Sequence, residues 1–238
     1  MAVRRDPPGG RRRRRLVLVC SLAATRLGRP LTPTEETAVS LAITEASGAP
    51  AGTAEGTGAG RALGGARQAS PRIPHVWAAL RDPTTEMARE LRVRGDSAEE
   101  LREMTRPVTD ALGGMVGGAL AGLFDAQTTV RPDFNAPVQA VDLSRMVIRG
   151  DEAVAMILAC VSSWAQAAID APGPARMIVR DELWRSLRVP ALLRKVDSDL
   201  RLSRAHGTIQ VLATHRLADF QAAGAAGSEE AAIASGLV

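Results

Sequence analysis

The 238-residue sequence contains no tyrosine, and its aromatic residues make up only 3% of the chain. Proteins that hold single-stranded nucleic acid usually stack the bases on aromatic side chains, so this scarcity argues against such a binder. Lys195 is the one lysine, and arginine supplies almost all of the positive charge. Arginine does not titrate in the working range, so the net charge of +4 is a modest basic balance.

Cysteine is also scarce. Cys20 and Cys160 lie in separate apolar stretches and have no metal-ligand spacing. A disulfide framework and a cysteine-based zinc site are therefore not expected, and a reducing compartment is the default.

A phosphate-binding loop of the form Gly-x-x-x-x-Gly-Lys-Ser/Thr is missing from the sequence. The glycines at 56, 58 and 60 superficially resemble one, but no apolar strand precedes them and no Lys-Ser/Thr follows. We predict a flexible Gly/Ala-rich linker over residues 47–70. Lys195 falls within a predicted helix and cannot replace the lysine of such a loop.

The first fifteen residues are rich in proline, glycine and arginine, and we predict that residues 1–15 are a disordered basic tail. The arginines at 11–15 and the apolar residues 16–23 imitate a secretory signal peptide. The apolar run is too short to span a membrane. The apolar pattern continues to Leu27, so we expect this segment to belong to the folded domain. A cleaved leader is the alternative.

Residues 16–120 are predicted to be a helical region, in which residues 74–112 would be an all-α insertion or lid beside a sheet. Thr32 and Glu35 form a capping box with a proline between them, which predicts a helix as far as Ala46. Residues 74–112 are predicted to be helical in pieces. The expected breaks are at Pro83, Gly95 and Pro107.

The C-terminal part alternates between strand and helix patterns. Residues 177–179 and 208–213 are short apolar runs typical of buried parallel strands, and residues 138–143 are a further candidate. Residues 152–169 form a long apolar helix pattern. The alternation predicts an α/β fold with a parallel sheet and right-handed crossovers. Asp142 could reach a ligand site, although a local cap is the plainer interpretation.

Polar residues follow two of these predicted strands. Asp181 and Glu182 come after the run at 177–179, and Thr214-His215-Arg216 ends the run at 208–213. Ligands of open α/β sheets bind at the carboxyl ends of the strands. In nucleotide hydrolases an aspartate there holds Mg²⁺ and a neighbouring group orients the attacking water, a role that suits Glu182. Alternatively, the acidic pair only caps the next helix.

Several of these segments resemble the ATPases of conjugative transfer and type IV secretion, which belong to the HerA/FtsK-like branch of P-loop NTPases. Residues 181–184 (Asp-Glu-Leu-Trp) are similar to that family's Asp-Glu-Ala-Trp Walker B signature. Residues 213–219 are similar to its Ala-Thr-Gln-Arg-x-x-Asp segment, although His215 stands where most members carry glutamine. Further similar segments are 123–128, 141–144 and 202–207, and the resemblance covers residues 16–238.

The resemblance implies that residues 121–238 are the C-terminal part of a RecA-like P-loop NTPase core, incomplete and with an α-helical insertion. It implies ATP and Mg²⁺ as ligands: Asp181 would hold the metal and Thr214 would contact the nucleotide. Glu182 would polarise the water, and His215 would sense the γ-phosphate. Arg204, or else Arg201, would be an arginine finger acting in trans, unless both only form a solvated helix face.

The resemblance also implies a function. Full-length relatives are cytoplasmic homo-hexamers that work with other secretion or conjugation subunits at the inner face of the plasma membrane, where any contact with DNA is indirect. Carboxylates without a phosphate loop would repel a nucleotide. We therefore expect an interior piece of a longer motor subunit that binds ATP weakly and has little or no activity. The alternative is a non-catalytic interaction or regulatory protein that retains the fold.

Overall fold

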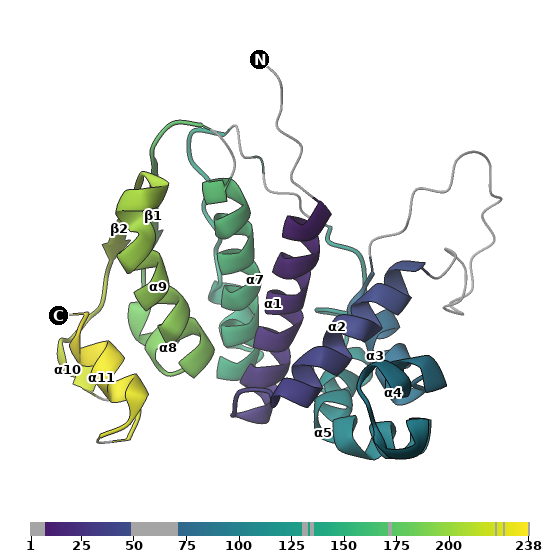
Figure 1. The fold of residues 1–238 in the computed structure, drawn as a ribbon. Coiled ribbons are helices and arrows are strands. Elements are labelled where there is room, and N and C mark those ends of the chain that lie inside the picture. Colours follow the sequence, from purple (N-terminus) through teal and green to yellow (C-terminus); the bar gives the residue numbers. More distant parts are fainter. Residues whose placement is uncertain are drawn as a thin grey trace. The chain divides into compact units, whose positions relative to one another are not determined.

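The computed structural model describes residues 8–48, 71–129, 133, 136–170, 173–221, 223–225 and 227–237. These residues form mostly helices, together with one small parallel sheet of two strands (Figure 1). The chain divides into two compact units, one of residues 1–14, 24–30 and 130–238 and the other of residues 15–23 and 31–129. Helix α1 (Pro8–Leu27) contributes residues to both units.

The predicted basic tail differs from what is observed. Residues 8–15 are the first turns of α1, whereas residues 1–7 lie outside the described residues. Arginine is a good helix former, and the apolar residues that follow the arginines give the helix a side to bury, as Val19 and Leu22 show. The predicted linker at 47–70 falls on the end of α2 and then on residues outside the described part.

The second unit is helical, as the sequence predicts for this part. Its further elements are α2 (Pro33–Gly48), α3 (Ile73–Arg81), α4 (Thr85–Glu90), the 3₁₀ turn η1 (Arg94–Asp96) and α5 (Ala98–Val116). The capping box at the start of α2 is confirmed: the Thr32 amide donates to Glu35 Oε2 at 2.8 Å, and the Glu35 amide donates to Thr32 Oγ1 at 3.2 Å. Helices α2, α3 and α5 pack together around buried side chains such as Val39, Leu80 and Leu112.

The predicted break at Pro107 is wrong, because α5 runs through it. A proline inside a helix removes one backbone hydrogen bond and usually kinks or ends the helix. Here the fully buried Leu101 and Leu112 lie on either side of the proline, so packing of one apolar face outweighs the local penalty. The predicted breaks at Pro83 and Gly95 are confirmed, and Gly95 adopts a positive φ of 67°.

The first unit contains the sheet. Strands β1 (Arg176–Arg180) and β2 (Thr208–Leu212) pair in parallel, with Arg176 opposite Thr208 and Arg180 opposite Leu212. The helices are α6 (Ser144–Val147), α7 (Asp151–Asp170), α8 (Leu183–Leu187), α9 (Pro190–His206), α10 (Ala218–Gln221) and α11 (Glu229–Ser235). The predicted strands at both apolar runs, their parallel pairing and the helix at 152–169 are confirmed.

The predicted strand at residues 138–143 is wrong, because these residues have no ladder partner. Val138 is 81% exposed, so the segment gains no burial that would favour a strand. Asp142 accepts hydrogen bonds from the amide (2.8 Å) and the hydroxyl of Ser144 and so turns the chain into α6. The local interpretation of Asp142 therefore holds.

Helix α9 covers one face of the sheet. On that face Arg180 donates to Asp199 Oδ2 of α9 at 2.5 Å and also to the side chain of Gln210. A cluster of buried apolar residues joins α8, α9, α10 and α11, and Leu212 of β2 packs against it. Its members are Leu183, Leu187, Leu193, Val196, Phe220, Ala223 and Ala234.

The opposite face of the sheet is exposed, although the sequence predicted buried strands. Met177 and Val179 of β1 stand beside Ile209 and Val211 of β2 in the strand register, and their exposed fractions range from 38% to 62%.

Helix α7 meets the length and composition criterion for a membrane span, with a mean hydropathy of 1.5, but core helices of soluble proteins meet it too.

Candidate functional site

The residues that follow β1 and β2 are joined at one edge of the sheet. The Ala213 amide donates to the carbonyl oxygen of Arg180 at 2.9 Å, and the Leu183 amide donates to the carbonyl oxygen of Ala213 at 2.9 Å. These two bonds continue the pairing past the strand ends. As the parallel arrangement predicts, Asp181-Glu182 and Thr214-His215 therefore share the carboxyl-terminal edge of the sheet.

Glu182 is the centre of this edge. Its backbone is left-handed, with φ 54° and ψ 41°, a conformation that is uncommon for a residue other than glycine. Its Oε1 lies 2.6 Å from Nε2 of His215, and its Oε2 accepts a hydrogen bond from the indole N–H of Trp184. The structure thus brings together Glu182 and His215, two of the predicted site residues.

These hydrogen bonds favour the charged form of Glu182. The bonds from Trp184 and His215, in that order, hold the pKa of the Glu182 carboxyl below its usual range, and nearby Arg185 adds to the effect. Hydrogen bonds to a carboxylate stabilise its charged form. Glu182 is therefore a firmly ionised carboxylate and a correspondingly weak base.

The side chain of Glu182 does not cap the next helix, although the alternative interpretation of the acidic pair predicted a cap. This residue occupies the N-cap position of α8, but its side chain makes no capping hydrogen bond. Asp181 is exposed, and its Oδ1 accepts from the Glu182 amide at 2.9 Å.

Asp181 can be tested as a metal ligand by the groups around it. Among the described residues, no three His, Cys, Asp or Glu side chains gather to hold a metal ion. Mg²⁺ commonly keeps several waters and uses only one or two carboxylates together with substrate phosphates. The described residues therefore form no metal centre around Asp181, and its role as an Mg²⁺ ligand stays a prediction.

Thr214 serves the local turn. Its hydroxyl donates to Asp219 Oδ2 at 2.9 Å, and the Arg216 amide donates to the same oxygen at 3.3 Å. These bonds fix the backbone on both sides of His215. The hydroxyl proton of Thr214 is therefore engaged, and its oxygen keeps lone pairs that can accept a hydrogen bond.

The two arginine-finger candidates, Arg201 and Arg204, belong to the later turns of α9 and not to the edge that carries Glu182. Helix α9 follows α8 at the acidic edge and ends at His206, and Gly207 alone separates it from the first residue of β2, so Arg204 belongs to the opposite edge. Arg201 pairs with Asp197 at 2.9 Å on an exposed helix face. The structure does not bring either arginine to Glu182 within one chain.

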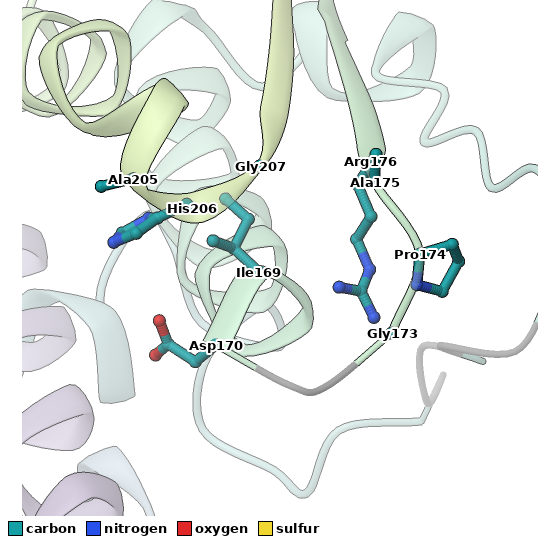
Figure 2. Close-up of a pocket in the computed structure, with 9 residues that line it drawn as sticks. All are labelled: Ile169, Asp170, Gly173, Pro174, Ala175, Arg176, Ala205, His206 and Gly207. Atoms are coloured by element: carbon teal, nitrogen blue, oxygen red, sulfur yellow. The ribbon is translucent and has the colours of Figure 1, made fainter.

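A cavity of about 450 Å³ lies at this opposite edge (Figure 2). No sequence motif pointed to it. Its polar side chains are those of Asp170, Arg176 and His206, and Asp170 is already engaged with Arg14 (3.3 Å) and with Gln166 (2.8 Å). The cavity lies at the amino-terminal ends of the strands, the edge where ligands of parallel sheets do not usually bind.

Trp184 is the site residue whose contacts the sequence did not reveal. Besides its bond to Glu182, its ring lies under the guanidinium groups of Arg185 (4.4 Å to the ring centroid) and Arg188 (4.9 Å). Cation–π contacts of this kind hold an aromatic ring in one orientation. The spacing from Glu182 was visible in the sequence, but the turn that brings the indole back to the carboxylate was not.

The chain matches no protein-family model, no curated protein and no solved structure.

Proposed function

We propose that the edge formed by Asp181, Glu182, Thr214 and His215 is a hydrolytic site for the phosphoanhydride of ATP. The observation that supports this most directly is the contact of 2.6 Å between Glu182 and His215, which joins the ends of two parallel strands. A carboxylate and an imidazole at this edge can orient water and move its proton. In this proposal, the two observed strands are part of the core of a RecA-like ATPase.

In this proposal, Asp181 holds Mg²⁺, which neutralises charge on the phosphate oxygens. Thr214 and His215 face the phosphates, and Glu182 is the carboxylate beside the attacking water. Arg204 would act in trans: a head-to-tail ring of subunits, such as a homo-hexamer, brings the opposite edge of one subunit to the acidic edge of the next. The protein would serve a conjugation or type IV secretion apparatus on the cytoplasmic side of the plasma membrane, in contact with other subunits and only indirectly with DNA.

The missing phosphate loop sets the expected strength of binding. Backbone amides and a lysine supply most of the grip on the phosphates in P-loop proteins. We expect the purified chain to bind Mg²⁺-ATP with a Kd above about 1 mM, a binding free energy of only about 4 kcal/mol. Titration calorimetry measures this directly, and micromolar affinity would contradict the reasoning.

Hydrolysis at several millimolar ATP tests the assignment of the site. We expect slow, Mg²⁺-dependent phosphate release that Glu182→Gln lowers by about 10-fold and that Asp181→Asn also lowers, with a higher Mg²⁺ requirement. The matched control is Glu99→Gln, an exposed carboxylate of the other unit. Equal activity in the wild type and in Glu182→Gln would refute the proposed site.

A second candidate function is protein interaction, favoured by the exposed face of Met177, Val179, Ile209 and Val211. Parallel sheets are normally covered on both faces, and exposed strand edges promote association. We expect the chain to self-associate and the double variant Met177→Thr/Val179→Thr to become more monodisperse in sedimentation velocity. Val138→Thr, an exposed valine outside the sheet, is the control. Unchanged association in the double variant would count against a role for this face.

A further inference from the structure

Both oxygens of the Glu182 carboxylate already have partners. The indole N–H of Trp184 can only donate, so Oε2 is an acceptor. The other oxygen, Oε1, faces Nε2 of His215 at 2.6 Å. An ionised carboxylate has no hydrogen to give, so Nε2 must carry the proton of this bond.

The second ring nitrogen of His215 is then the one with a lone pair. When Nε2 of a neutral imidazole carries the proton, Nδ1 is an acceptor. No hydrogen bond to Nδ1 occurs among the described residues, and the His215 side chain is 70% exposed. Nδ1 is therefore accessible to a water molecule or a substrate at the edge of the sheet.

The backbone holds the two partners in place. The bond from the Ala213 amide to the Arg180 carbonyl joins the strand ends, and Asp219 secures the turn on both sides of His215. The charged neighbours are Arg185, whose Nε lies 4.0 Å from Glu182 Oε2, and Asp181, which accepts from the Glu182 amide. Neither of these two is a hydrogen-bond partner of the imidazole, so Glu182 is the acidic group that orients His215.

We propose that Glu182 and His215 form a carboxylate–imidazole dyad in which Nδ1 of His215 accepts the proton of the attacking water, while Glu182 positions the ring. The proposal rests on the proposed function for its substrate class, a phosphoanhydride. The water oxygen forms a bond to phosphorus, and one of its protons moves to Nδ1. The bond from phosphorus to the bridging oxygen breaks, the electron pair stays on the leaving phosphate, and Nδ1 later releases its proton to solvent.

This assignment reverses the roles that the sequence suggested. Glu182 becomes a positioning residue, and His215 becomes the base instead of a sensor of the γ-phosphate. An imidazole also suits the task, because one ring nitrogen can accept a proton while the other keeps its bond to Glu182. The assignment predicts that loss of His215 costs more activity than loss of the Glu182 charge.

The first test needs no nucleotide. The sequence has three histidines, so long-range ¹H–¹⁵N spectra of the full chain at pH 8 should resolve each ring. We expect His215 to carry its proton on Nε2, with a bare Nδ1, and both nitrogen shifts to change in Glu182→Gln. His75 is an internal reference for the same tautomer, since its Nδ1 accepts from the Arg72 amide at 3.2 Å. A proton on Nδ1 of His215, or shifts insensitive to Glu182→Gln, would overturn the dyad.

The second test measures the reactivity of Nδ1 by acylation with diethylpyrocarbonate at pH 8, followed by mass spectrometry. His206 is the matched control, because it is also exposed but has no carboxylate partner among the described residues. We expect His215 to be acylated several-fold faster than His206, and this advantage to disappear in Glu182→Gln. Equal rates for the two histidines in the wild type would refute an activated imidazole.

The third test uses Mg²⁺-ATP hydrolysis. We expect His215→Ala to lower turnover by about 10²-fold and Glu182→Gln by only about 10-fold. Added imidazole should restore part of the lost turnover in His215→Ala, which a purely structural role would not allow. A larger loss in Glu182→Gln, or no rescue, would overturn His215 as the base. If the wild type hydrolyses no ATP, the proposed function fails, whereas nitrogen shifts and acylation rates still decide the dyad.

Discussion

Asp199 is a buried charge of α9 that pairs with Arg180 of the sheet. Its side chain is 6% exposed and accepts hydrogen bonds from Arg180, at 2.5 Å, and from Lys195. Burial lowers the pKa of Arg180, and the charge of Asp199 opposes that effect. The charged guanidinium therefore relies on this carboxylate to compensate for the water that it loses on burial.

The expected cost of Asp199→Ala depends on the contacts that Arg180 and Lys195 retain without this carboxylate. Lys195 is 29% exposed and retains Gln166, so its ammonium can turn toward water. The Arg180 side chain is only 13% exposed and retains a bond to Gln210. The change therefore leaves one buried, partly satisfied charge, for which we expect a loss of about 3 kcal/mol in the free energy of unfolding.

Urea unfolding followed by tryptophan fluorescence measures this loss. The substitution Trp77→Phe as a common background confines the signal to Trp164 and Trp184, which belong to the unit that contains Asp199. An unchanged m-value would show that the denatured state is the same in both proteins. The melting temperature should fall by about 10 °C.

The control is Asp197→Ala on the same helix. Asp197 pairs with Arg201, whose side chain is 74% exposed, so its loss should cost only about 0.5 kcal/mol. If Asp199→Ala cost no more than Asp197→Ala, the argument from burial would be wrong. The double variant Arg180→Met/Asp199→Leu should recover most of the stability, because it leaves no unpaired charge.

Two further predictions concern burial and capping. Burial raises the pKa of the Cys20 thiol to about 12 and that of Cys160 to about 11. Both thiols should therefore react slowly with a thiol reagent at pH 8 in the native protein and rapidly in denaturant. Fast labelling of either cysteine in the native protein would contradict this. Thr32→Ala should cost about 1 kcal/mol, because it removes the capping box of α2. Thr44→Ala in the same helix, where the hydroxyl only bonds the Ser40 carbonyl, should cost little; equal losses in urea unfolding would refute the cap.

The sequence by itself determined the features that depend on neighbouring residues. Thr32 and Glu35 lie three positions apart, so their capping box needs only the local helix. The apolar runs that became β1 and β2 were recognisable because their length and flanking residues suit a strand. Their parallel pairing also followed from the helix pattern between them, which places Glu182 and His215 at one edge.

The tertiary structure alone decided the features that join distant residues. Glu182 and His215 are 33 positions apart, and their contact depends on the left-handed turn at Glu182 and on the bonds around Ala213. The exposed face of β1 and β2 could not be read from the apolar runs, because a pattern reports what a residue can bury and not whether another element covers it. The same holds for Pro107, where packing of α5 outweighs a local preference that would end the helix.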